Sequence, residues 1–493
     1  MADSFQPDRI QKLEDLKASG VDPYPATPPA SRAMAADVLA TFENCVGDEV
    51  TLCGRVMARR GYGKLAFLDL ADQSGRIQAV MEKALLSPED FSLLKMMNLG
   101  DLVEITGELK PTQKGQPSVY GKSMRILTKA LLDPPAKWQG LQDTELRARM
   151  RYVDLFSNDE VRQRFQKRSA IMSAMRRVFE KHAFLEVETP VLHPLYGGAN
   201  ARPFTTHHNA LDMGLYLRIA PELYLKRLLV GGMERVYEFA RVFRNEGLSN
   251  RHNPEFTMLE FYQAFADYRT MIDLTESLVA AGAQAAGLEP KGGKLLTTFR
   301  GKEYDLTAPF QRVRWADAFE NKVGCSPTDT SAVLAKLKEE DIQASSSEGY
   351  GWWRAVNDLF ERLVEPTLQG PVFVIDYPAA ICPLAKPIAE DPVWAERFEF
   401  FLGGMEIANA FSELNDPQKQ LENFQAQVAE ATNDPESPNA VDHDYIRALA
   451  YGMPPAGGCG IGMDRLIMVL LGVDTIRDVL LFPHMRPETE EAE

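Results

Sequence analysis

Several common signatures are missing from this 493-residue sequence. Its five cysteines are scattered and form no CxxC pair, which argues against a disulfide framework and against a cysteine zinc site. No apolar run is long enough to span a bilayer, and the first residues, MADSFQPDRI, contain no apolar signal core. There is no GxxxxGK[ST] loop, and the run AGGCGIG does not follow a dinucleotide-fold pattern. We therefore expect a cytoplasmic protein with no membrane association and no P-loop or Rossmann site.

Net positive charge is also missing from the chain as a whole. The formal net charge is −16, which by itself argues against nucleic acid as a partner. Residues 51–130 differ, because they hold 12 Lys and Arg against 8 Asp and Glu, whereas the remainder holds 42 against 62. Charge alone does not separate a nucleic-acid-binding segment from a chance fluctuation.

The order of sequence patterns predicts a multidomain protein. Residues 1–45 predict a helical extension with a Pro-rich break, VDPYPATPPA. Residues 46–132 contain short runs rich in Val, Ile, Leu and Phe between Gly and Asp, typical of an all-β OB-fold barrel. We expect a linker over 133–160. Residues 161–493 alternate helical and strand patterns, which predicts an α+β domain on an antiparallel sheet with flanking helices and a helical insertion at about 315–368.

The stretch RVFRNEGLSNRHNPEFTMLE, from Arg241 to Glu260, places positive charge beside an apolar strand. Strand alternation puts Phe256, Met258, Glu260 and Tyr262 on one face and the intervening residues on the other. A buried carboxylate at Glu260 requires a cation. Two interpretations are open: Glu260 pairs with a nearby arginine, or it lines a pocket for a positively charged ligand, with Phe256 as a flat apolar surface.

A second pattern, FEFFLGGMEIANAF, contains a two-residue hairpin signal at Gly403–Gly404. Folding there pairs Leu402 with Met405 and Phe401 with Glu406, so that Glu399 and Glu406 share a face. Two neighbouring carboxylates repel each other unless a cation lies between them, and carboxylate oxygens without His or Cys suit Mg²⁺. Two solvated glutamates on an exposed face are the alternative.

Three segments together resemble a known enzyme family. Pro190 ends the helix-then-strand segment closing on EVETP, Arg244 lies in FRNEG, and Asp464–Arg465 lie in the Gly-rich strand-to-helix turn GGCGIGMDRLIMVLL. In this order they resemble the three signature motifs of class II aminoacyl-tRNA synthetases. The barrel is similar to the anticodon-binding domain of the aspartyl, asparaginyl and lysyl subgroup, and GGANARPFTTHHNALD and RIAPELYLKRLLVGG resemble the lysyl-tRNA synthetases. Nearly the whole chain fits this pattern.

The resemblance implies ATP-dependent activation of L-lysine and transfer of lysine to tRNA(Lys), with Mg²⁺ as cofactor and a homodimer formed through the first motif. It implies a role for each matching residue. These are Arg244, Glu246, His252, Asn253, Phe256 and Arg465 for ATP, with Arg244 and Arg465 catalytic; Gly198, Glu222, Glu260, Tyr262, Asn409, Phe411 and Glu413 for lysine; Glu399 and Glu406 for Mg²⁺; and Phe67 and Gln78 for an anticodon base.

The acidic residues of the implied pocket agree with this substrate. Three carboxylates, Glu222, Glu260 and Glu413, suit a substrate with two ammonium groups. An aspartate substrate would instead need an Arg or Lys at the pocket floor, and these strands supply none.

Some positions depart from the pattern of the family. EIANAFSEL has Ala408 and Ala410 where relatives have glycine, and a bulge near Ala408 is needed to bring Asn409 to the same face as Glu406. Each added methyl would trim the pocket. Cys382 stands in place of serine, and Gln116 in place of a glutamate beside the anticodon. The alternatives are therefore a paralogue that activates a lysine analogue or loads a protein acceptor, and a non-catalytic binding protein.

Overall fold

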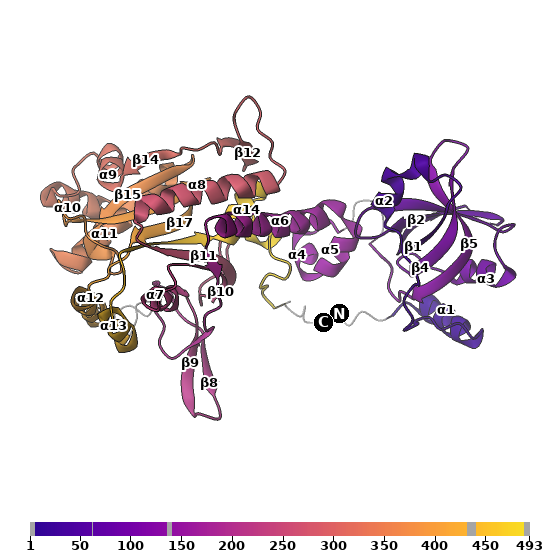
Figure 1. The fold of residues 1–493 in the computed structure, drawn as a ribbon, viewed down its shortest axis with the longest axis horizontal. Coiled ribbons are helices and arrows are strands. Elements are labelled where there is room, and N and C mark those ends of the chain that lie inside the picture. Colours follow the sequence, from indigo (N-terminus) through magenta and orange to yellow (C-terminus); the bar gives the residue numbers. More distant parts are fainter. Residues whose placement is uncertain (1–4, 62, 136–140, 431–439, 488–493) are drawn as a thin grey trace. The chain divides into compact units, whose positions relative to one another are not determined.

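The computed structural model describes residues 5–61, 63–135, 141–430 and 440–487. Contacts within the chain divide it into two compact units, Met1–Arg162 and Gln163–Glu493, whose elements are labelled in Figure 1. Among the described residues, no helix has the length and apolar character that a membrane crossing requires.

The first unit contains a closed five-stranded barrel with the strand order β1-β2-β3-β5-β4, as the OB-fold prediction requires. Alternate Val, Leu and Ile side chains of these strands fill its interior, while charged residues face outward. Its elements are α1 (Pro7–Ala18), α2 (Ala35–Ala40), β1 (Glu49–Arg60), β2 (Leu65–Ala71), β3 (Arg76–Glu82), α3 (Pro88–Met96), β4 (Leu102–Pro111) and β5 (Pro117–Thr128).

One ion pair of the first unit is fully buried. Asp101 and Lys129 are both without solvent exposure, and Lys129 Nζ lies 2.8 Å from Asp101 Oδ2. The backbone N–H groups of Asn98 and Ala130 also donate to this carboxylate, at 2.7 and 2.8 Å. The pair therefore fixes the loop before β4 to the segment after β5.

The predicted linker, 133–160, contains helices rather than extended chain in its described part. These are α4 (Thr144–Arg149) and α5 (Arg151–Ser157), and α6 (Asp159–Lys181) begins within it. Arg151 and Asp154 are buried and paired at 2.8 Å, which explains why this polar segment is ordered.

The second unit is built on an eight-stranded sheet with the order β14-β15-β16-β17-β18-β11-β10-β6. The six central strands are antiparallel, as predicted, but both edge pairs are parallel. Parallel neighbours need a crossover connection, and helices α9–α11 supply it between β14 and β15. The strands are β6 (Leu185–Glu186), β10 (Arg235–Phe243), β11 (Glu255–Ala264), β14 (Gln311–Arg314), β15 (Val372–Pro378), β16 (Trp394–Leu402), β17 (Met405–Ser412) and β18 (Ala456–Gly462).

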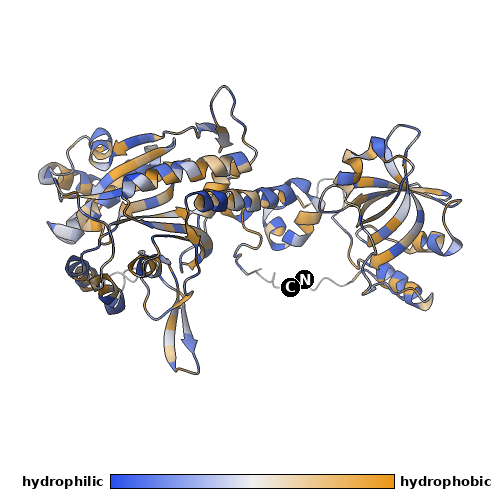
Figure 2. Cartoon of the chain, viewed as in Figure 1, coloured by the Kyte–Doolittle hydropathy of each residue, from blue (hydrophilic) through white to orange (hydrophobic). Residues whose placement is uncertain are grey.

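Helices cover both faces of this sheet (Figure 1). One face packs against α6, α8 (Tyr268–Ala285) and α14 (Met463–Leu471) in the largest apolar core, and Figure 2 shows the matching hydrophobic colour along the strands. The other face packs against α7 (Glu222–Val230) and α13 (His443–Ala450), with α12 (Pro417–Glu430) beside them. The predicted helical insertion consists of α9 (Trp315–Val323), α10 (Thr330–Glu339) and α11 (Gly349–Leu363), around a core that includes Trp315.

Smaller elements complete the second unit. A three-stranded sheet precedes α7, and a two-stranded hairpin follows α8. Their strands are β7 (Leu192–His193), β8 (Thr205–His208), β9 (Met213–Leu217), β12 (Leu296–Phe299) and β13 (Lys302–Asp305).

We predict that Asp101→Ala destabilises the first unit. The change leaves the buried Lys129 ammonium with the Asn98 amide oxygen but no carboxylate, and breaking a buried ion pair costs roughly 3–5 kcal/mol of unfolding free energy. Urea denaturation followed by circular dichroism measures this loss. Lys122→Ala is the control, because Lys122 and its partner Glu49 are exposed and the stability should change little. Equal stability of the two variants would contradict the prediction.

Candidate active site

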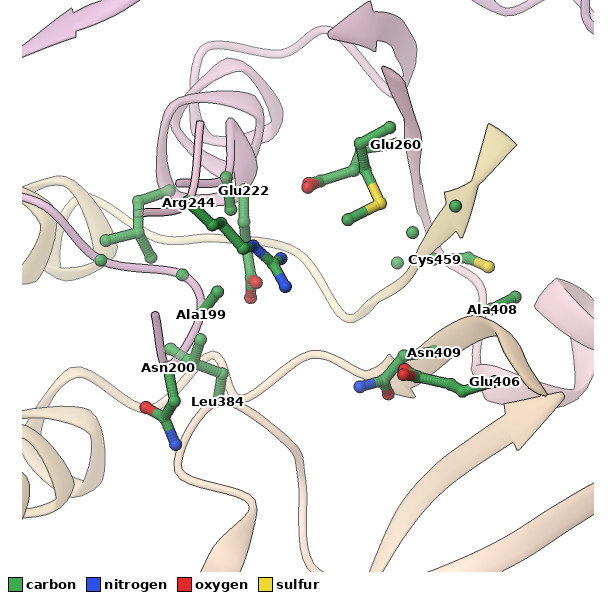
Figure 3. A pocket seen from close by; sticks show the side chains of 18 of the residues that line it. Ala199, Asn200, Glu222, Arg244, Glu260, Leu384, Glu406, Ala408, Asn409 and Cys459 are labelled. Atoms are coloured by element: carbon green, nitrogen blue, oxygen red, sulfur yellow. The ribbon is translucent and has the colours of Figure 1, made fainter. Parts of the chain in front are cut away.

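A cavity of about 440 Å³ opens on the face of the large sheet that packs against α7. Residues from β11, β17, β18, the start of α7 and the segment after β10 line it. Figure 3 shows Glu222, Arg244, Glu260, Glu406 and Asn409 pointing into the space between these elements. The cavity brings together most of the predicted residues: Gly198, Glu222, Arg244, Glu246, His252, Asn253, Phe256, Glu260, Tyr262, Glu406, Asn409, Phe411 and Arg465.

The floor of the cavity is nearly bare backbone. Strand β18 pairs with β11 on one side and β17 on the other, so that Gly460 stands opposite both Glu260 and Asn409. Gly458, Gly460 and Gly462 face the cavity, while Cys459 and Ile461 between them are in the core. A Cβ at Gly458 would lie 2.0 Å from Glu413 Oε1, so glycine is required there.

Strand β11 has the alternation predicted from the sequence. Phe256, Met258, Glu260 and Tyr262 line the cavity, whereas Leu259 and Phe261 lie in the core. Glu260 is buried and accepts a hydrogen bond from the Tyr262 hydroxyl at 2.9 Å. Among the described residues no ion pair joins Glu260 to an arginine. Burial, reinforced by the nearby Glu222 carboxylate, raises the pKa of Glu260 to about 8. The structure thus favours a cation-accepting pocket over the internal Arg pair.

Arg244 and Phe256 face each other at the mouth of the β10–β11 hairpin. The Arg244 backbone N–H donates to the Pro254 carbonyl at 2.8 Å, which closes the hairpin. The guanidinium carbon lies 5.3 Å from the centre of the Phe256 ring, and both side chains are half-buried. A guanidinium in this position can bind a phosphate, and the face of the neighbouring ring can stack on a planar base.

Arg465, the third residue of α14, reaches the same mouth from the other side. Its Nη1 donates to the Glu406 carbonyl at 3.0 Å, and its Nη2 lies 2.9 Å from His252 Nε2. A guanidinium can only donate, so His252 Nε2 accepts and Nδ1 carries the proton toward Ser249 Oγ at 2.8 Å. Burial lowers the pKa of His252, as do the nearby arginines, which agrees with a neutral ring.

Strands β16 and β17 form the predicted hairpin. Leu402 pairs with Met405 and Phe401 with Glu406, as expected. The register then shifts, so that Phe400 pairs with Ala408 and Glu399 with Asn409, and Ile407 is the extra residue of a bulge. This confirms the bulge expected near Ala408 and places Glu399, Glu406 and Asn409 on one face.

The two alanines share the core side of the sheet. Ala408 stands opposite Ile461 and Ala410 opposite Cys459, and both alanines belong to the largest apolar core, although Ala408 also borders the cavity. The expectation that both added methyl groups trim the pocket is therefore wrong, because beyond the bulge strand alternation directs both side chains away from the cavity.

Glu399 does not line the main cavity. It lines a second cavity of about 270 Å³ beside α11 and is bonded at both oxygens. Arg397 Nη2 donates to Oε1 at 2.5 Å, and the Tyr377 hydroxyl donates to Oε2 at 2.8 Å. Burial raises the pKa of Glu399, Arg397 opposes this, and the nearby Glu406 carboxylate raises it further.

The predicted metal ligands fit Mg²⁺ only together with a phosphate ligand. In the part of the chain that the structure describes, no group of three or more His, Cys, Asp or Glu residues is placed to hold a metal ion. Glu399 and Glu406 supply two mutually repelling carboxylates, and each oxygen of Glu399 keeps a further lone pair. Mg²⁺ is commonly held by one or two carboxylates together with substrate phosphates, so this donor set suits it.

Glu413 lies behind the cavity wall rather than on it. It is 1% exposed and pairs with Lys226, which has no exposed surface and also lies 2.5 Å from Glu222 Oε1. The sequence reasoning missed Lys226. Its position four residues after Glu222 on a helix was the available signal, because i and i+4 side chains meet on one helix face.

Arg397 is a second residue that the sequence reasoning missed. Its Nε donates to Asn409 Oδ1 at 3.1 Å and its Nη1 to Cys382 Sγ at 3.2 Å, in addition to the bond to Glu399. It therefore connects a predicted lysine-site residue to a predicted metal ligand. Its place two residues before Glu399, on the same strand face, was the signal in the sequence.

The predicted anticodon residues lie on the outer face of the barrel in the first unit. Asp69 of β2 pairs with Gln78 of β3, and Phe67 is two residues before Asp69, so all three share a face. Gln78 is buried beneath Arg60, which donates to Gln78 Oε1 at 3.0 Å. Phe67 is half-buried and offers a ring on which a base could stack.

The chain is similar to known proteins over nearly its whole length. The family model described as tRNA synthetases class II (D, K and N) matches residues 143–486, and the model described as an OB-fold nucleic acid binding domain matches residues 50–127. A lysine–tRNA ligase of Carboxydothermus hydrogenoformans is 48% identical over 97% of both chains. Lysine–tRNA ligases of Syntrophomonas wolfei and Chloroflexus aurantiacus are 46% and 45% identical over at least 97% of each chain. On its motifs, its fold and these matches, the chain belongs to the class II tRNA synthetases of the D, K and N group.

Proposed function

We propose that this protein is a lysine–tRNA ligase that activates L-lysine with ATP and transfers it to the 3′-terminal ribose of tRNA(Lys). The observation that carries the proposal is a single cavity that is positively charged at its mouth and lined by carboxyl groups in its interior. Its mouth holds Arg244, Phe256 and Arg465, which suit a nucleotide, and its interior holds Glu222 and Glu260, which suit ammonium groups. The similarity of the whole chain to lysine–tRNA ligases supports the same substrates.

The first step is an in-line displacement at the α-phosphate. The lysine carboxylate attacks the α-phosphorus, the bond to the bridging oxygen breaks, and pyrophosphate leaves. Arg244 and Arg465 offset the negative charge that develops there, while Phe256 holds the adenine ring. Mg²⁺, held by Glu399 and Glu406 together with the phosphates, would neutralise phosphate charge when bound.

The second step transfers the lysyl group. A terminal ribose hydroxyl of the tRNA attacks the carbonyl carbon of the adenylate, and AMP leaves. We assign no side chain as a general base. Phe67 and Gln78 are proposed to contact an anticodon base, Glu246, His252 and Asn253 to border ATP, and Gly198, Tyr262, Asn409, Phe411 and Glu413 to complete the lysine site. A homodimer and the cytoplasmic location stay predictions.

The alternative is a paralogue that activates a lysine analogue or loads a protein acceptor. The barrel with its outer Phe67 and Arg60 favours tRNA as acceptor, because a protein-loading enzyme would not need it. Arg244, Arg465, Glu399 and Glu406 also count against a non-catalytic binding protein.

Pyrophosphate exchange with a panel of amino acids tests the proposal. L-Lysine should drive exchange, ornithine and norleucine should drive it weakly, and transcribed tRNA(Lys) should then accept lysine. Exchange with an analogue but not with lysine would favour the paralogue, and the absence of any exchange would favour the non-catalytic protein.

We predict that Arg244→Ala lowers the rate of lysine-dependent exchange by roughly 100-fold or more, because it removes a positively charged donor at the developing charge. The control is Arg235→Ala, which removes an exposed arginine at the other end of β10 and should preserve activity. Full activity of Arg244→Ala would refute the assigned mechanism.

We also predict that lysine binding weakens as the pH falls below 8. The pKa of Glu260 is raised to about 8 by burial, so the carboxyl is increasingly protonated below that pH and a bound ammonium must displace the proton. Below pH 8, the KM for lysine should therefore rise as the pH falls, by a factor that approaches roughly tenfold for each pH unit. Exchange rates measured from pH 6 to 8.5 give this slope.

The matched variant for this titration is Glu260→Gln, which cannot ionise. It should raise the KM for lysine at pH 8.5 and remove most of the dependence of that KM on pH. The KM for ATP, measured over the same pH range, shows whether groups other than Glu260 titrate. A wild-type KM for lysine that does not vary with pH would contradict the role given to Glu260.

A further inference from the structure

The most unusual charged group of the second unit is an ammonium with no contact to solvent. Lys226 lies one helical turn after Glu222 on α7, and none of its surface is exposed. Its Nζ is 2.5 Å from Glu222 Oε1 and forms an ion pair with Glu413 Oε2. The rings of Phe411 and Tyr262 lie beside it, with centroids at 5.0 and 5.9 Å.

We propose that Lys226 is a specificity-determining residue of the amino-acid site: its ammonium is a resident counter-ion that pairs with Glu222 and Glu413 and holds both carboxyl groups in place at the end of the site that receives a substrate ammonium. The inference rests on the proposed function, because it assigns the resident charge to the binding of a diamino acid.

Each buried charge depends on the others. A carboxylate as enclosed as Glu413 would take up a proton without a cation beside it, and an ammonium as enclosed as Lys226 would lose one. Burial lowers the pKa of Lys226, but the Glu222 and Glu413 carboxylates outweigh burial and the pKa is raised overall. Burial also raises the pKa of Glu413, and the Lys226 ammonium opposes that rise.

The carboxyl groups at this end of the site outnumber the ammonium groups that the chain supplies there. Glu222, Glu260 and Glu413 bring three carboxyl groups, and Lys226 is paired with two of them. Glu260, which accepts a hydrogen bond from Tyr262, is left for an ammonium of the substrate.

One atom near the cavity still lacks a partner. Glu413 Oε1 is buried and accepts no hydrogen bond from the residues that the structure describes. It lies beside Gly458, a cavity residue at which a Cβ would come within 2.0 Å of this oxygen. An unpaired acceptor at this place is what a donor from the ligand would satisfy.

Two other roles for Lys226 make different predictions. A purely structural ion pair would contribute to stability without changing substrate selection. A placeholder, displaced when lysine enters, would compete with substrate, so its removal would strengthen lysine binding.

The test compares Lys226→Met, which keeps an unbranched apolar chain in place of the lysine stem and loses the ammonium, with Lys338→Met, which changes an exposed lysine of the same unit. In pyrophosphate exchange, Lys226→Met should raise the KM for L-lysine by roughly tenfold to a hundredfold, since one partner of a buried pair is lost. The KM for ATP should stay within about twofold of wild type. Lys338→Met should match wild type in both constants.

Chemical rescue sharpens the comparison. Lys226→Ala removes three methylene groups and the ammonium, which n-propylammonium replaces atom for atom. Added n-propylammonium should lower the KM of Lys226→Ala for lysine and have no effect on Lys226→Met, where the space is filled. If Lys226→Met does not fold by circular dichroism, Lys226→Ala refolded with and without the amine carries the same comparison.

Each outcome decides between the roles. An unchanged KM for lysine in a folded variant, or no rescue by the amine, would overturn the proposal in favour of a structural pair, and a lowered KM would indicate a placeholder. Wild-type protein that shows no lysine-dependent exchange would instead refute the proposed function itself.

Discussion

The active-site cavity depends on strand β18 presenting no side chains to it. This strand is the shared neighbour of β11 and β17, and it holds residues about 150 positions apart in the sequence on either side of one glycine, Gly460. Its alternate residues Cys459 and Ile461 fill the core, so the strand is anchored on one face and bare on the other. Any side chain at Gly458 would meet Glu413 and Tyr262, so the space for a ligand exists because this strand gives up half of its side chains.

The charged side chains around that floor differ in how deeply they are buried. The arginines are half-buried at the mouth, where phosphates of a nucleotide could keep some contact with water. The glutamates are buried deeper, where a bound ammonium would offset the cost of desolvating them. Arg397 links the main cavity to the second one, because it bonds Asn409 on one side and Glu399 on the other. The main cavity thus has a positively charged mouth and an acidic interior.

Local periodicity predicted a large part of this arrangement. The alternation of β11, the hairpin at Gly403–Gly404 and the bulge near Ala408 follow from rules that act over a few residues, and the structure has all three. Contacts between distant segments could not be predicted in the same way. Placing Lys226 against Glu413 requires the packing of α7 against the end of β17, and placing Glu399 in a second cavity requires α11. The parallel edge strands were missed because a short strand carries no mark of its direction.

The bulge at Ile407 has a consequence for how this strand would be recognised in other sequences. Inward and outward positions alternate along β17, but the extra residue reverses the phase between Glu406 and Ala408. A search for amphipathic strands with a fixed two-residue period would read two short fragments and divide them at the cavity. The most informative part of the strand is therefore the part where simple pattern recognition loses its signal.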